Sequence, residues 1–157
     1  MRPVRPTDER AIGDFYRRLS PQTRYLRFSS PMPDPPDSLL RLITSVDDRR
    51  RLALLAESDI ADCGEVVALS ECAALDDHTA EVGFVVGDEW QRQGLGTMMA
   101  MRTLGAAQAL GFDLFVAEMC CYNVAVMRLL DRVGVVLSKR TSRGVSEVTF
   151  VPRRPAT

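Results

Sequence analysis

A loop rich in backbone amides is the part of this sequence best suited to chemistry. It consists of Gln91, Arg92, Gln93, Gly94, Leu95, Gly96 and Thr97. Two glycines separated by one residue let the backbone turn tightly and approach a ligand closely. The apolar residues that follow have helical spacing, so we expect a helix to begin near Gly94 with amides that lack partners inside the helix. Free amides at the positive end of a helix dipole predict an anion site, most naturally for phosphate.

The loop departs from two common phosphate-binding motifs. No Lys-Ser or Lys-Thr follows the second glycine, as a Walker A loop requires. Met99 stands where the dinucleotide-binding fingerprint has its third glycine or alanine. From the residues alone, a plain turn remains an alternative to a phosphate site.

Alternating strands and helices are expected to position this loop. Period-two patterns predict strands at residues 52–56, 66–75, 80–86, 114–120, 135–137 and 145–151, with a short one starting at Val4. Helical patterns lie at residues 11–19, 21–28, 94–110 and from 123, and a short helix is expected to be capped by Asp37 or Ser38, as Thr7 would cap the first. These elements predict a mixed α/β fold, with helices on both faces of a mostly antiparallel sheet.

Size and composition favour one enclosed core. A chain of 157 residues with 46% hydrophobic content predicts a single domain over residues 1–157. The net charge of -1 implies no general affinity for nucleic acid or for an anionic membrane. No apolar run reaches the roughly 18 to 20 residues that span a bilayer, and the N-terminus lacks a signal-peptide core, so we expect a cytoplasmic protein. The oligomeric state is not readable, and a homodimer stays open.

Metal binding is not expected. The four cysteines, Cys63, Cys72, Cys120 and Cys121, contain no Cys-x-x-Cys pair, and His78 is the single histidine. In a cytoplasm the thiols should be reduced. We interpret them as small, partly buried residues, with a reactive thiol at Cys120 or Cys121 as the alternative. His78 is expected at the surface of a turn, with a contribution to an acceptor site as the alternative.

Two stretches resemble known sequences. The pattern Gln-x-x-Gly-x-Gly, placed after a strand and before an apolar helix, resembles the pyrophosphate motif of the GNAT acetyltransferase superfamily. Residues 19–28, Leu-Ser-Pro-Gln-Thr-Arg-Tyr-Leu-Arg-Phe, resemble the matching stretch of GNAT domains in bacterial Pat-type protein lysine acetyltransferases. The resemblance implies the GNAT fold, in which two central strands splay apart and acetyl-CoA binds in the split.

The resemblance also implies which residues hold acetyl-CoA. Val85, Val86 and Gly87 would pair with the pantetheine arm. The amides of residues 91–97 would bind the pyrophosphate, and Thr97 could add a hydroxyl. Asn123 matches an asparagine that contacts the cofactor arm, although a helix cap is the alternative for this residue. For Arg92, the alternative to a phosphate contact is a plain exposed arginine.

Glu81 matches the position of the general-base glutamate in lysine-acetylating GNAT domains. A free lysine has a pKa near ~10.4, so only about one in 10³ to 10⁴ is neutral at pH 7, and a carboxylate base helps it to react. The alternative is an ordinary exposed strand glutamate, and Glu71 and Glu118 are weaker candidates for the base. The backbone N–H of Val86 could stabilise the oxyanion.

One position departs from the family pattern. Many members carry a tyrosine seven residues after the motif asparagine, as an acid toward the thiolate, but this chain has Leu130 there. Tyr122 is close in sequence and need not point inward. Because a CoA thiol has a pKa near that of cysteine, the thiolate can leave with limited help.

The resemblance thus implies an acetyl-CoA-dependent N-acetyltransferase, most naturally one that acetylates lysine side chains of proteins. Two alternatives remain open. The first is the same chemistry on a small amine, such as a polyamine, an amino acid or an antibiotic. The second is a non-catalytic acyl-CoA sensor.

Overall fold

A seven-stranded sheet forms the centre of the computed structural model, which describes residues 1–60 and 64–153. The strand order is β1-β2-β3-β4-β5-β7-β6, and among the pairs formed by the described residues β4–β5 alone is parallel. The strands are β1 (Arg2–Pro3), β2 (Arg51–Ser58), β3 (Glu65–Ala74), β4 (Thr79–Val86), β5 (Leu114–Cys120), β6 (Gly134–Ser142) and β7 (Val145–Pro152). The helices are α1 (Glu9–Arg18), α2 (Pro21–Phe28), α3 (Asp37–Thr44), α4 (Leu95–Ala109) and α5 (Val124–Val133), with 3-10 turns η1 (Pro6–Asp8) and η2 (Asp88–Trp90).

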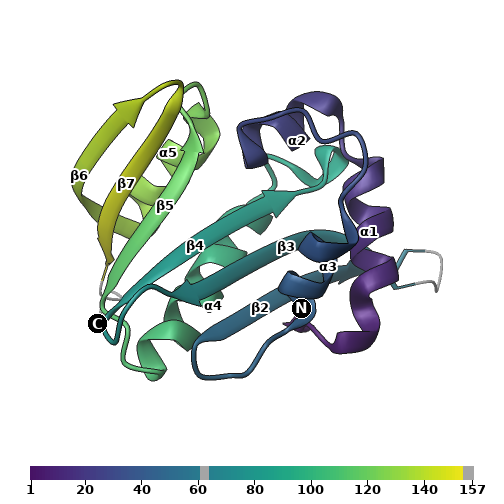
Figure 1. Cartoon of the computed structure of the whole chain (residues 1–157), viewed down its shortest axis with the longest axis horizontal. Coiled ribbons are helices and arrows are strands. Elements are labelled where there is room, and N and C mark those ends of the chain that lie inside the picture. The colour runs from purple at the N-terminus through teal and green to yellow at the C-terminus, as the bar shows by residue number, and fades with distance from the viewer. Residues whose placement is uncertain (61–63, 154–157) are drawn as a thin grey trace.

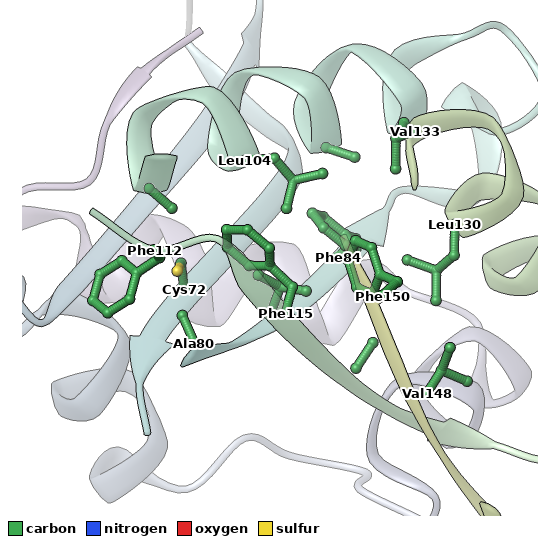
Figure 2. Close-up of a cluster of buried hydrophobic side chains, with 14 of the residues drawn as sticks. Cys72, Ala80, Phe84, Leu104, Phe112, Phe115, Leu130, Val133, Val148 and Phe150 are labelled. Carbon is green, nitrogen blue, oxygen red and sulfur yellow. The ribbon is translucent and has the colours of Figure 1, made fainter. Parts of the chain in front are cut away.

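Helices cover both faces of this sheet, as predicted (Figure 1). On one face α1 and α3 pack Phe15, Tyr16 and Ile43 against the sheet, where Leu55 and Val85 meet them. On the other face α4 and α5 enclose a second core, which includes Phe84, Phe115 and Phe150 (Figure 2). Val85 and Phe84 thus face opposite cores, which is the period-two alternation expected of β4.

Most predicted strands are present, and β2, β3 and β4 form an antiparallel meander, consistent with the predicted mostly antiparallel sheet. The last two strands form a longer hairpin than predicted. The strand expected at residues 135–137 is β6, which continues to Ser142 because its polar half pairs with β7. Val4 lies just after β1 rather than starting it, although its amide still donates to the carbonyl of Ala53 at 2.9 Å.

Helix starts agree with the sequence in part. Ser20 caps α2 by accepting a hydrogen bond from the Thr23 amide at 3.1 Å. The predicted cap of α3 at Asp37 or Ser38 is wrong, because the cap position is Pro36 and no side chain bonds there. The predicted cap at Thr7 is also wrong, because Thr7 lies inside η1. Arg5, the residue before η1, donates its backbone amide to the Asp8 carboxylate.

The sheet opens between its two middle strands. Within the described residues, β4 and β5 are in register at residues 79–81 and 114–116 only, and beyond these positions the two strands diverge (Figure 1). The diverging ends point toward α2. The sequence also indicates a turn at residues 59–64, between the strands expected at 52–56 and 66–75, and a tail that begins at Pro152. Residues 61–63 of this turn and residues 154–157 of this tail lie outside the described part of the chain. None of the helices in that described part is both long and apolar enough to cross a membrane.

Candidate active site

The predicted anion loop lies between β4 and α4. Gly94 is the residue before the helix and has φ 85°, a left-handed conformation that glycine adopts without strain. The first intrahelical bond of this turn runs from the Met98 amide to the Gly94 carbonyl, at 3.1 Å. The amides of Leu95, Gly96 and Thr97 therefore precede the helical ladder and are available to a ligand. Residues 91–94 are exposed and residues 95–97 are half-buried, so the loop is open to solvent.

Val85, Val86 and Gly87 lie at the end of β4 that has separated from β5. The Gly87 amide donates to the Val67 carbonyl at 2.8 Å, so it belongs to the ladder with β3. Because successive peptide groups of a strand face opposite neighbours, the amide and carbonyl of Val86 point to the open side. The Gln91 side chain donates to this carbonyl at 3.1 Å. The structure thus brings Val86 and the anion loop together at one opening.

A narrow cleft lies between the diverging strands. Its walls are residues 82–84 of β4 and residues 117–119 of β5, and Leu26 and Asn123 also line it. The buried Asn123 side chain accepts a hydrogen bond from the Val126 amide at 3.2 Å and donates to the Leu26 carbonyl at 3.5 Å. Asn123 therefore caps α5 and fastens α2 over the cleft. Its predicted cofactor contact stays a prediction.

A larger cavity, of about 360 Å³, opens beside this cleft on the α3 side of the sheet. Three carboxylates line it: Glu71 on β3, Glu81 on β4 and Glu118 on β5. Glu81 and Gly83 share one face of β4, as the period-two pattern predicts. The remaining walls come from the end of α2, from α3 and from the start of β2, including Phe28, Leu39 and Arg51.

The environment of Glu81 favours its neutral form. Glu81 is exposed to solvent, and the partial desolvation of its carboxyl group raises its pKa. The negative charges of Glu118 and Glu71 raise this pKa further, while Arg27 and Arg51 act in the opposite direction. A carboxyl group with a raised pKa is better matched to accepting and releasing a proton near neutral pH. The position can therefore support acid–base chemistry.

An ion pair that the sequence analysis did not find crosses the floor of this cavity. Arg27 Nη2 of α2 lies 2.7 Å from Glu71 Oε2 of β3. The guanidinium lies on Gly83, where an added Cβ would stand 2.9 Å from the Cζ atom of Arg27. A larger residue at this position would have to displace the guanidinium. The glycine at position 83 was the one indication of this contact in the sequence, because a glycine inside a strand often marks a place where another group approaches the backbone closely.

A second connection that was not predicted holds the start of α2. The Asp88 carboxylate in η2 accepts hydrogen bonds from the Ser20 amide at 2.8 Å and from the Ser20 and Thr23 hydroxyls at 2.7 Å each. The Gln91 side chain also donates to the Thr23 hydroxyl at 3.3 Å. The segment that leads into the anion loop is thereby tied to the helix that covers the cleft.

Neither Leu130, which has no proton to donate, nor Tyr122 lines the cavity or the cleft. Leu130 is fully buried in the α4–α5 core, and Tyr122 has 79% of its surface exposed. Cys72 and Cys120 are buried and Cys121 is half-buried, and burial raises the pKa of Cys72 to about 12. Cys63 lies outside the described residues. His78 is exposed in the turn before β4, as predicted. Within residues 1–60 and 64–153, no group of three or more His, Cys, Asp or Glu side chains could hold a metal ion.

These features fit an extended ligand with a phosphate end. The open amides at the start of α4 suit the phosphates, and the outward peptide group of Val86 can pair with an amide-bearing arm. Arg92 is exposed in the loop with φ 61°, where its side chain is free to meet a phosphate or remain in solvent. The residues present therefore fit the pyrophosphate and pantetheine parts of a CoA thioester.

Comparison with known proteins agrees with this geometry. The family model described as "Acetyltransferase (GNAT) domain" matches residues 1–136. The chain is 29% identical to Acetyltransferase Pat of Mycolicibacterium smegmatis over 165 residues, which cover 99% of this chain and 48% of that protein. It is 27% identical to Acetyltransferase PA5475 of Pseudomonas aeruginosa over 139 residues, covering 87% of this chain and 74% of that protein. The chain thus spans about half the length of the first relative.

Solved structures share the fold. The GNAT domain of S. lividans PAT superposes with a TM-score of 0.85 at 23% identity, over 96% of this chain and 88% of that one. Salmonella typhimurium yncA, solved with its cofactor acetyl-CoA, superposes with a TM-score of 0.72 at 18% identity, over 95% and 90% of the two chains. With the family model matching most of its length, the chain belongs to the GNAT acetyltransferases, which transfer an acetyl group from acetyl-CoA to an amine.

Proposed function

We propose that this acetyltransferase modifies lysine side chains of proteins, with Glu81 as the general base. One observation carries the proposal: Glu81 lines an acidic cavity at the point where β4 and β5 separate. The cavity and the cleft share Gly83, Glu118 and Arg27 in their walls, so the two spaces adjoin. An amine in the cavity would therefore lie next to a ligand in the cleft.

The chain's own residues account for the steps around the amine. Acetyl-CoA, when bound, supplies the thioester carbonyl that the amine attacks. The carboxylates of the cavity attract a lysine ammonium, and Glu81 removes its proton, either directly or through a water molecule. The amide of Val86 faces the open side of β4 and can donate a hydrogen bond to the thioester oxygen. With Leu130 at the usual tyrosine position, the sulfur leaves as a thiolate without a proton from that position.

The acceptor class is supported by two features. The segment at residues 19–28 that resembles Pat-type lysine acetyltransferases forms α2, which borders both the cavity and the cleft. The matched relative from M. smegmatis is itself named Acetyltransferase Pat. A small amine is the second candidate, because a cavity of about 360 Å³ lies within the range of small-molecule sites.

The test uses isotope-labelled acetyl-CoA and a cleared bacterial lysate. Wild-type protein is compared with Glu81→Gln and with Glu147→Gln, which changes an exposed strand glutamate outside the cavity. We expect label in discrete protein bands with wild type and Glu147→Gln. Glu81→Gln should lose about 10² to 10⁴ in rate while it still binds acetyl-CoA.

Each other result has a clear meaning. Label confined to small molecules would replace the protein acceptor with a small amine. Full activity of Glu81→Gln across the pH range would show that Glu81 is not the base. With Glu81 as base, wild-type activity should fall as the pH drops through its raised pKa, because protonation removes the form that accepts a proton.

A further inference from the structure

Arg27 belongs to both spaces of the active site. It lines the cavity that contains Glu81 and also the cleft between β4 and β5. Its side chain is 23% exposed and that of its partner Glu71 is 21% exposed. The pair is therefore mostly shielded from solvent, where charges act on their neighbours more strongly than at an open surface. Arg27 also stacks on its neighbour Phe28, with 5.2 Å between Cζ and the ring centre.

The bonding of Arg27 is incomplete for a purely structural ion pair. Among the described residues, two buried side-chain polar atoms lack a hydrogen-bond partner, and these are Arg27 Nε and the Tyr16 hydroxyl. Leaving a buried donor unpaired is unfavourable, and such atoms call for an explanation. If the ion pair served stability alone, we would expect every N–H group of the guanidinium, including that of Nε, to donate a hydrogen bond.

The charges around Glu81 show what Arg27 contributes. Four charged groups from four elements face Glu81, namely Glu118 on β5, Arg27 on α2, Glu71 on β3 and Arg51 on β2. Arg27 and Glu71 act on Glu81 with opposite signs. Because they are bonded to each other, each largely cancels the effect of the other on Glu81.

We propose that Arg27 is a positioning residue of the acetyl transfer: it shields Glu81 from the charge of Glu71 and forms the wall between the acceptor cavity and the cofactor cleft. This inference rests on the proposed function, since it assumes that Glu81 is the base. It gives a role to the glycine at position 83, whose missing side chain leaves the space that the guanidinium occupies.

Removing Arg27 and removing Glu71 should shift the pKa of Glu81 in opposite directions. Arg27→Met removes the positive charge and leaves Glu71 unneutralised, so the pKa of Glu81 should rise. Glu71→Gln removes the negative charge and leaves Arg27 unneutralised, so the pKa of Glu81 should fall. Arg27→Lys keeps the charge and should leave the pKa of Glu81 close to that of wild type, although a lysine lacks the planar fork.

The titrations are read by NMR on protein labelled with ¹³C at the glutamate carboxyl carbon, and the Glu81 signal is assigned by its loss in Glu81→Gln. Circular dichroism establishes that each variant is folded. In parallel, the pH dependence of kcat/KM is measured with a lysine-containing peptide. The pKa that defines the acidic limb should rise in Arg27→Met and fall in Glu71→Gln. The kcat of Arg27→Met should also fall about tenfold or more, because the wall between the amine and the thioester is altered.

The outcomes separate this inference from the proposed function. Opposite shifts in the two variants, with Arg27→Lys unshifted, support the role of Arg27. If Glu81→Gln is inactive but the two variants shift in the same direction or not at all, the inference is overturned and Glu81 remains the base. If Glu81→Gln keeps full activity, the proposed base is wrong, and the positioning role of Arg27 is overturned with it.

Discussion

The carboxylate of Asp88 accepts hydrogen bonds from both the backbone amide and the hydroxyl of Ser20, 68 residues earlier in the chain, at 2.8 and 2.7 Å. This contact joins Ser20, the N-cap residue of α2, to η2, the 3-10 turn that follows β4. Arg27 fastens the other end of the same helix to β3. The helix that covers the cleft is thus held at both ends by polar contacts.

Asp88→Asn should loosen the start of α2. An asparagine keeps one oxygen acceptor but replaces the other with a donor, so one or more hydrogen bonds are lost, at about 1 kcal/mol of unfolding free energy for this exposed site. Urea denaturation measures the loss. Glu89→Gln is the matched control, because this exposed neighbour contributes only its backbone carbonyl, to Gln93.

The loss in Asp88→Asn should depend on pH. Although burial opposes ionisation, the hydrogen bonds from Ser20 and Thr23 outweigh it and lower the pKa of Asp88. A carboxyl whose pKa is lowered on folding adds stability above its unfolded pKa of about 3.9 and loses it as the pH falls through the folded value. The stabilities of wild type and Asp88→Asn should therefore converge in acid, and a difference that is constant with pH would contradict this account.

Gly83→Ala should displace Arg27 without altering its charge. The added Cβ would overlap the guanidinium, and the flexible arginine can move away more easily than the strand. We expect the protein to stay folded while kcat falls about tenfold or more, since small displacements near a reacting group have large effects on rate. Gly105→Ala is the control, because an added Cβ there has open space around it. Unchanged kcat in Gly83→Ala would show that the position of Arg27 is unimportant.

The two glycines of the anion loop should respond differently to alanine. Gly94→Ala should lower stability by about 1 to 2 kcal/mol, because φ is 85° at this position. Gly96→Ala meets only Val86 Cγ2, at an ordinary 3.5 Å, and should leave stability unchanged or slightly higher in the first turn of α4.

Acetyl-CoA affinity, measured by calorimetry, separates structure from binding in this loop. Gly96→Ala should weaken binding about tenfold or more, because its methyl group hinders close approach to the amides. Equal affinity of wild type and Gly96→Ala would place the phosphates away from these amides.

Asn123 has two roles to distinguish, a helix cap and the predicted cofactor contact. Asn123→Ala should cost about 1 kcal/mol of stability through loss of the cap, whereas Asn123→Ser can still cap α5. If Asn123 also contacts the cofactor, both variants should bind acetyl-CoA more weakly than wild type. If Asn123→Ser binds acetyl-CoA as tightly as wild type, the role of Asn123 is limited to capping α5 and to its hydrogen bond with the Leu26 carbonyl. Thermal unfolding and calorimetry on the same samples give both quantities.

Local patterns were enough to predict the frame of the site. The alternation at residues 80–86 places Glu81 and Gly83 on one face, and the two glycines of the loop mark the start of α4. Both features depend on neighbours in sequence, which is where period and turn chemistry carry information. The edge strand β6 was underestimated because residues 138–142 are polar and exposed and pair on one side only, so they have no apolar alternation.

The polar contacts that complete the site were not predictable in the same way. Arg27 and Glu71 are 44 residues apart, and Asp88 and Ser20 are 68 apart. Charged residues on surface elements follow no period, and any of several partners would look equally suitable in the sequence. These pairs can be identified only from the three-dimensional structure, in which α2 lies over β4.

The short parallel seam between β4 and β5 also bears on the cooperativity of the whole molecule. Three paired positions join the β1–β4 half of the sheet to the β5–β7 half. The two halves are thus weakly coupled through the backbone, and local opening should begin at this seam. Amide hydrogens of Phe84 and Val86 should exchange with solvent faster than those of Val85 and Gly87, which lie on the β3 side. The two halves still share the hydrophobic core that contains Phe84, Phe115 and Phe150. A ligand that fills the seam would slow the exchange of the amides that face it.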